Sequence, residues 1–250
     1  MTQEEGPPKS KFVDALDLGW LSFFRLPLWV VLMLTLPGLF ASASGPFFAL
    51  YRPNNALGRF LETLVGFILW LVPRMGITSM EWQAVRAKRP NAAEAFRVDS
   101  RLWPYFLATA PVVFLAAVDS AATDFRHHPV GSLWTFPLMF IEIYLTIRLM
   151  PCRYLAAGGA DHSLKRGWKA SDGQVWNFAI LYFFSMMPAG LIILAAETLG
   201  KNTAWPGTGW ASPGELAHVL AIVVASIGFT LGTLVQVAYV KEMVKTQTRK

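Results

Sequence analysis

Six long apolar segments separated by polar stretches dominate the chain, and their lengths predict membrane-spanning helices. Each segment is about 17 to 25 residues long and carries few charges. At 1.5 Å per residue this is enough to cross a hydrocarbon core of roughly 30 Å. Proline inside several segments is compatible with this interpretation, because neighbouring helices can satisfy the backbone groups that proline leaves free. The predicted spans are Leu26 to Ser44, Phe60 to Gly76, Leu102 to Val118, Leu133 to Met150, Trp176 to Ala196 and Leu216 to Val240.

A shorter amphipathic pattern precedes the first span and recurs before two later ones. Four apolar residues of segment 12–23 follow one another at spacings of four, four and three, which places them on one face of a helix. A helix of this kind lies in the headgroup plane with its apolar face toward the lipid. Segments 92–97 and 163–168 stand in the same position before the third and fifth spans. We therefore expect an all-α polytopic membrane protein of three transmembrane hairpins, each preceded by a cytoplasmic interfacial helix. Connectors next to lipid also tend to look amphipathic, and for segment 92–97 both interpretations stay open.

The first and third of these segments share a sequence motif. Segment 15–20 reads ALDLGW and segment 163–168 reads SLKRGW, so both follow the pattern small-Leu-x-x-Gly-Trp. With Phe23 and Pro27, the first copy resembles the corresponding segment of a broad group of six-helix bacterial membrane proteins. The membrane domain of glycerophosphoryl diester phosphodiesterases is grouped with them. As in that group, the later copy continues with a small residue, a glycine and an aromatic residue, here Ser171, Gly173 and Trp176.

The resemblance implies a six-helix fold in the bacterial inner membrane. It implies no catalytic residues for this chain, because we expect no attached soluble domain that could hold a phosphodiesterase site. The expected organisation is a cytoplasmic segment with an interfacial helix over residues 1–25, a transmembrane domain over 26–240 and a basic cytoplasmic tail over 241–250.

Composition supports the membrane class independently. Hydrophobic residues make up 54% of the chain, charged residues only 15%, and the mean hydropathy is +0.41. A soluble domain of this size would leave too much apolar surface facing water. Tryptophan falls mostly at or just outside the span ends, where an amphipathic indole prefers to lie. The indoles expected to anchor interfacial segments are those of Trp20, Trp103, Trp168 and Trp176.

The distribution of basic residues predicts the orientation. Of the 22 Lys and Arg residues, 18 lie before the first span, in the loops after spans two and four, or after span six. By the positive-inside rule this side is cytoplasmic, so both termini are expected there. The pI is about 9.6. However, the basic residues cluster beside span ends and alternate with acids, which favours anionic lipid headgroups over nucleic acid as the partner.

A search for catalytic or cofactor chemistry finds little. The sequence has no glycine-rich phosphate loop, no paired cysteines, no HExxH and no nucleophile elbow. We therefore expect no enzyme activity and no cofactor. Asp124, His127 and His128 form the one candidate metal site, with ligand types that suit Zn or Cu. Adjacent histidine side chains usually diverge, so we expect no bound metal there.

Glu142 is the single polar residue that most needs an explanation. It lies near the middle of the fourth span, where an ionised carboxylate costs on the order of 3 kcal/mol. Such a residue should face protein or water and have a partner in another span. The candidate partners lie in the sixth span, with Gln236 foremost. Glu142 is then either a proton or ion site, or a neutral side chain hydrogen-bonded between helices.

The sixth span also carries a small-residue face at Gly228 and Gly232, which allows another helix to approach closely. The partner is another span of this chain, a second copy or another integral membrane protein. We therefore expect a non-enzymatic accessory, scaffold or assembly subunit of a larger membrane complex. The alternative is a small-solute or ion transporter, or a lipid-handling protein, that uses Glu142.

Overall fold

The computed structural model of the chain describes residues 11–33, 56–86, 88–122, 129–202 and 213–248. These residues form helices and short connections without any strand, which confirms the all-α prediction for the described part of the chain. The helices are α1 (Lys11–Phe23), α3 (Ala56–Val85), α4 (Ala92–Ala95), α5 (Leu102–Ala121), α6 (Pro129–Ala157), α7 (Ser163–Ser171), α8 (Val175–Asn202) and α9 (Pro213–Thr248).

Four of the described helices are long and apolar enough to cross a membrane. They are α3, α5, the Val175–Ile192 part of α8 and the Val223–Val244 part of α9. This agrees with the class of α-helical membrane protein. Of the other two predicted spans, Leu133 to Met150 falls within α6, whereas Leu26 to Ser44 lies partly outside the described residues. The six-span topology, its three hairpins and its orientation therefore stay predictions.

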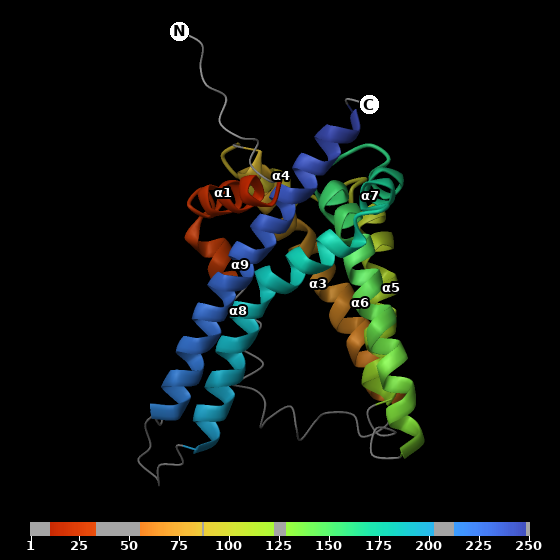
Figure 1. Ribbon diagram of the computed structural model, residues 1–250, viewed down its shortest axis with the longest axis vertical. Coiled ribbons are helices and arrows are strands. Elements are labelled where there is room, and N and C mark those ends of the chain that lie inside the picture. Colours follow the sequence, from red (N-terminus) through yellow and green to blue (C-terminus); the bar gives the residue numbers. More distant parts are fainter. Residues whose placement is uncertain (1–10, 34–55, 87, 123–128, 203–212, 249–250) are drawn as a thin grey trace.

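The long helices form two groups that meet at one end and separate toward the other (Figure 1). One group contains α3, α5 and α6, which pack side by side, and the other contains α8 and α9, with α1 against α9. The short helices α1, α4 and α7 all lie at the end where the groups meet, which we call the short-helix end. This end is the one predicted to be cytoplasmic.

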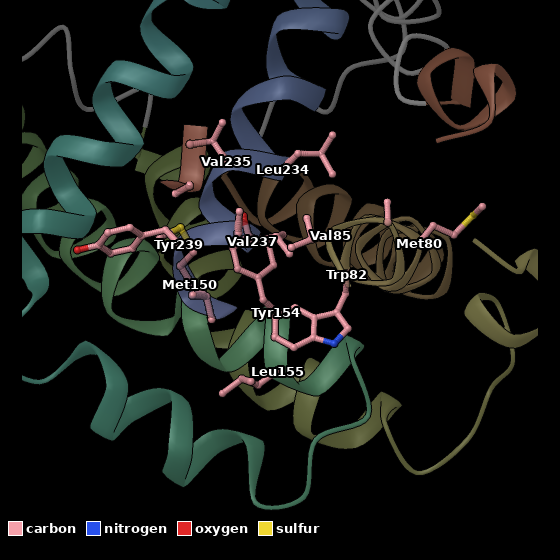
Figure 2. Close-up of a cluster of buried hydrophobic side chains, with 14 of the residues drawn as sticks. Met80, Trp82, Val85, Met150, Tyr154, Leu155, Leu234, Val235, Val237 and Tyr239 are labelled. Carbon is pink, nitrogen blue, oxygen red and sulfur yellow. The ribbon is translucent and has the colours of Figure 1, made fainter. Parts of the chain in front are cut away.

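The main hydrophobic core lies at the short-helix end. It contains the part of α3 beyond the predicted span end at Gly76, residues of α6 on both sides of Met150, and residues 234–243 of α9, most of which lie inside the predicted sixth span. The last ten residues of α3, Gly76–Val85, are all buried. Figure 2 shows side chains of these helix ends packed together, among them Met80, Trp82, Val85, Met150, Tyr154, Leu155, Leu234, Val237 and Tyr239. In this region the helices bury their surface against one another. Arg74 and Arg153 therefore lie inside α3 and α6 and do not mark the ends of these helices.

The glycine of the repeated motif marks the point where a short helix crosses a long one. A Cβ on Gly19 of α1 would lie 2.6 Å from Cγ2 and 2.9 Å from Cα of Val235 in α9. A Cβ on Gly167 of α7 would lie 2.5 Å from both N and Cα of Cys152 in α6. Real Cβ atoms do not approach backbone this closely. The glycines are therefore required because the two backbones touch.

The short helix before α5 makes a different contact, in which the glycine lies on the long helix and faces a side chain. Helix α4 packs on α3, and the ring of Phe96, next to α4, covers Gly76 of α3 so closely that the ring would have to move to admit a Cβ. The glycine is thus on the long helix here and on the short helix in the other two crossings. Each short helix packs on a long one, α4 on α3, α7 on α6 and α1 on α9.

Arg101 joins three helices at the short-helix end. Its Nη1 donates to Ser79 Oγ of α3 at 3.2 Å and to the carbonyl of Ala157, the last residue of α6, at 3.4 Å. Its Nη2 donates to the carbonyl of Glu94 in α4 at 2.6 Å. Its Nε binds both carboxylate oxygens of Asp99, at 2.8 and 3.0 Å. One planar guanidinium therefore fixes the relative positions of α3, α4 and α6.

The Asp99 ion pair predicts a pH dependence of stability. Hydrogen bonding to Arg101 lowers the pKa of the Asp99 carboxyl below its ordinary value. A lowered folded-state pKa stabilises the fold above the unfolded-state pKa of about 3.9, and this stabilisation is lost as pH falls through the folded-state pKa. We expect Asp99→Asn to lower Tm at neutral pH, with a difference from wild type that shrinks in acid. Thermal unfolding in detergent between roughly pH 2 and pH 7 measures it. A difference that stays constant with pH would contradict the ion pair.

Candidate functional site

A polar cavity of about 320 Å³ lies between the two groups of long helices. Side chains from five helices line it, so it exists only because both groups come together. The lining residues are Arg74 and Thr78 of α3, Tyr105 of α5, Thr146, Arg153 and Tyr154 of α6, Tyr182 of α8, and Ser226, Phe229, Thr233 and Gln236 of α9. We call this space the polar cavity.

Nearly every side chain that lines the polar cavity carries a hydrogen-bonding group. The lining contains two arginines, three tyrosines, four Ser or Thr residues and one amide, with Phe229 as the apolar member. No carboxylate is among these residues. An anionic group would therefore meet two positive charges and several hydroxyl donors, without a competing negative charge in the wall.

Hydrogen bonds hold the walls of the polar cavity in place. The Tyr154 hydroxyl donates to Gln236 Oε1 at 2.7 Å, and Gln236 Nε2 donates to Ser185 Oγ of α8 at 2.9 Å. This chain links α6, α9 and α8 across the junction of the two groups. Between α3 and α5, the hydroxyls of Thr78 and Tyr105 lie 3.4 Å apart. The polar atoms are thus fixed by the fold before any ligand arrives, which lowers the cost of binding.

The two arginines retain unused hydrogen-bond donors. Arg153 Nη2 donates to the carbonyl of Thr146 at 2.9 Å. Within the described part of the chain, the Arg74 guanidinium makes no hydrogen bond to another residue. Each guanidinium has five N–H donors in a planar fork, a geometry that matches carboxylate and phosphate oxygens. The arrangement can bind one such oxyanion.

Glu81 is a buried carboxyl on the same side of α3 as the cavity arginine. It lies seven residues after Arg74 and three after Thr78, so all three point to one face of the helix. Its side chain is 0% exposed, and neither carboxylate oxygen has a hydrogen-bond partner among the described residues. It does not line the cavity, but its charge interacts with that of Arg74. Glu81 therefore offsets part of the positive charge of the site.

The structure places the predicted polar residues Gln236 and Glu142 differently. Gln236 is buried and lines the polar cavity. Glu142 is half-buried on α6, one turn from the cavity residue Thr146 and on the same face, but it does not line the cavity. The structure does not pair the two side chains by a hydrogen bond within its described part. The role of Glu142 stays a prediction.

The other predicted residues lie away from the polar cavity. Gly228 and Gly232 line an apolar groove that α9 forms with α1 and α8, so their small face points toward helices of the same chain. The predicted indole anchors all have exposed side chains, namely Trp20, Trp103, Trp168 and Trp176. Asp124, His127 and His128 lie outside the described residues. Within the described ranges, no group of three or more His, Cys, Asp or Glu residues could hold a metal ion.

Sequence reasoning missed Arg74, Arg153 and Glu81 as site residues. In the sequence their charges place all three at or beyond the ends of the second and fourth predicted spans, whereas the structure places them inside α3 and α6. Pro73 and Pro151 beside the arginines gave no signal of this, because proline ordinarily kinks or ends a helix and here each stands inside one.

Comparison of the chain with protein-family models, curated proteins and solved structures finds no match. The resemblance to the six-helix bacterial group therefore stays a prediction. The fold and the polar cavity define the class, which is an α-helical protein with membrane-length helices and an internal cationic site.

Proposed function

We propose that this protein is a transporter or lipid-handling protein that binds a small anionic group in the polar cavity, with Arg74 and Arg153 as the ligand-binding cations. The observation that carries the proposal is the pair of arginines in the lining of the polar cavity. The rest of the lining consists of hydroxyl groups, one amide and one phenyl ring, without a carboxylate. A volume of about 320 Å³ accommodates a small solute or one headgroup. In either ligand, the arginines would bind a carboxylate or phosphate group.

The energetics favour a binding role over a purely structural one. Arg74 and Arg153 are both half-buried between helices, and taking a charge out of water is costly unless the charge is paired. Glu81 carries at most one negative charge, so at least one of the two positive charges is left for a ligand. A ligand with at least one negative charge would neutralise the site. An accessory subunit that only packs against other helices gains nothing from such a cavity, so the cavity supports the transport or lipid-handling class over the accessory class.

The proposal is tested by identifying what the purified protein carries. The full chain, extracted in mild detergent, would be analysed by native mass spectrometry and by extraction of small molecules and lipids. We expect wild type to retain an anionic compound. The Arg74→Gln/Arg153→Gln double variant should retain at least about tenfold less of it per protein, because each arginine supplies charge-assisted hydrogen bonds. Arg97→Gln, at an exposed arginine outside the cavity, is the matched control and should retain the compound.

Glu142→Gln distinguishes this site from the one predicted from sequence. Because Glu142 does not line the cavity, its neutral variant should bind the anion as wild type does. Equal retention by wild type and the double arginine variant, with both correctly folded by size-exclusion chromatography, would overturn the proposal. If only Glu142→Gln lost the compound, the binding site would be at Glu142 and not in the polar cavity.

A further inference from the structure

A second, separate hollow lies at the short-helix end, where α7 lies beside the end of α6 and α9 passes close by (Figure 1). Its volume is about 400 Å³. It shares no lining residue with the polar cavity and is independent of the proposed function. Its polar side chains are Trp82, Arg86, Asp161, Arg166 and Lys241, and we call it the basic hollow.

Positive charge dominates the basic hollow. Three cations, Arg86, Arg166 and Lys241, line it together with one acid, Asp161. Lys241 Nζ donates to the carbonyl of Val85, the last residue of α3, at 2.8 Å, so it is held in place by the fold. A helix C-terminus is a favourable position for a cation. The net charge of the lining is thus two positive units, at a surface predicted to face the headgroup region.

The two arginines of the basic hollow have donors to spare. Within the described part of the chain, neither guanidinium makes a hydrogen bond or an ion pair. The Arg86 guanidinium lies over the Trp82 ring, 5.7 Å from its centroid, which fixes one side of the group and leaves its edge available. A guanidinium edge is suited to bidentate binding of phosphate.

Trp82 positions Arg86 and does not itself face a ligand. Its side chain is only 6% exposed, and its indole Nε1 is buried without a hydrogen-bond acceptor among the described residues. Nε1 lies against Gly158, where a Cβ would collide with it, so the glycine backbone covers this atom. Gly158 and Gly159 line the hollow without side chains, which leaves its space to the arginines.

We propose that the basic hollow is a phosphate-binding site in which Arg86 and Arg166 bind the phosphate oxygens, with Lys241 adding charge and Trp82 holding Arg86 in place. The chemistry fits either the phosphate of an anionic lipid headgroup or a free phosphate compound. The exposed indoles at this end of the molecule favour the lipid headgroup, because tryptophan side chains lie at the depth of the headgroups.

Thermal unfolding of the full chain in a non-ionic detergent tests this site. The additions would be phosphatidylglycerol, phosphatidylcholine, inorganic phosphate, and sodium chloride at matched ionic strength. We expect phosphatidylglycerol to raise Tm and phosphatidylcholine and chloride to have little effect. In Arg86→Gln/Arg166→Gln the apparent affinity for phosphatidylglycerol should fall at least about tenfold, since two charge-assisted contacts are removed. The matched control is Arg89→Gln, at an exposed arginine outside the hollow.

The outcomes separate the possibilities. A rise in Tm with inorganic phosphate equal to that with phosphatidylglycerol would assign the site to a free phosphate compound. No effect of either addition, or an equal effect in wild type and the double variant, would overturn the proposal. The unliganded Tm and the size-exclusion profile of each variant establish that it folds. Since Arg74→Gln/Arg153→Gln leaves this hollow intact, a response retained in that variant assigns the effect to the basic hollow and not to the polar cavity.

Discussion

Replacing Gly167 by alanine is expected to destabilise the protein, although the same change inside a helix ordinarily stabilises it by up to about 1 kcal/mol. The added Cβ would lie 2.5 Å from N and Cα of Cys152. These are backbone atoms of α6, so no side-chain rotation relieves the contact, and α7 must move away from α6. Overpacking of this kind costs typically 1 to 3 kcal/mol, on the order of several degrees in Tm. Thermal unfolding in detergent measures the change.

Two glycines in the same molecule provide the control. A Cβ on Gly66 of α3 or Gly190 of α8 would meet no atom within 4 Å. Alanine at either position should leave Tm unchanged or raise it, because only the helix propensity changes. The prediction is therefore a difference in sign between Gly167→Ala and Gly66→Ala. If both variants were equally stable, the close crossing of α7 over α6 would be wrong.

Arg101→Lys is expected to be the second strongly destabilising change. The arginine side chain is only 13% exposed, and it donates to groups of α3, α4 and α6 and to Asp99. Lysine keeps the charge but has no planar fork, so it cannot reach these acceptors together. Hydrogen bonds involving a charged group are worth about 1.5 to 3 kcal/mol each, and we expect a total loss of about 3 kcal/mol. The measurement is Tm in detergent, together with limited proteolysis of the connection around α4.

Arg97→Lys is the matched control, because Arg97 is exposed and only its backbone carbonyl contacts Arg101. Its Tm should remain within experimental error of wild type. If Arg101→Lys behaved in the same way and the α4 connection stayed resistant to protease, Arg101 would not be the residue that joins the three helices.

The fold class could be predicted from the sequence because hydrophobicity and length report directly on the solvent of a helix. The beginnings of α5 and α8 agree with the predicted starts to within one residue. The ends of α3, α6 and α9 do not, since charged residues near Arg74 and Arg153 look like the edge of the membrane. The pattern records which residues avoid water. It does not record that helix ends beyond the predicted spans bury themselves against other helices, as the segment Gly76–Val85 does.

The polar cavity could be predicted only in fragments. The sequence offers Gln236 only as a candidate partner for Glu142 in the sixth span, whereas the residues that line the cavity come from five helices that are far apart in the sequence. Which face of each helix points inward depends on packing. The sequences of α8 and α9 give little indication of the inward face, because apolar residues are spread around both helices. Glu142 and Gln236 are both candidate site residues because each is a polar residue within an apolar segment. Only the packing of the helices shows that Gln236 lines the cavity and Glu142 does not.

The exchanged glycines at the three crossings have a consequence for sequence divergence. At Gly19 against Val235 and at Gly167 against Cys152 the short helix contributes the residue without a side chain, and at Gly76 against Phe96 the long helix does. The first two contacts include the backbone atoms N and Cα, which every residue has, so a smaller residue at position 235 or 152 would make no room for a Cβ; the third contact is with a side-chain ring. Homologous chains are therefore expected to keep glycine at positions 19 and 167 whatever residue faces it, and to exchange volume only between positions 76 and 96.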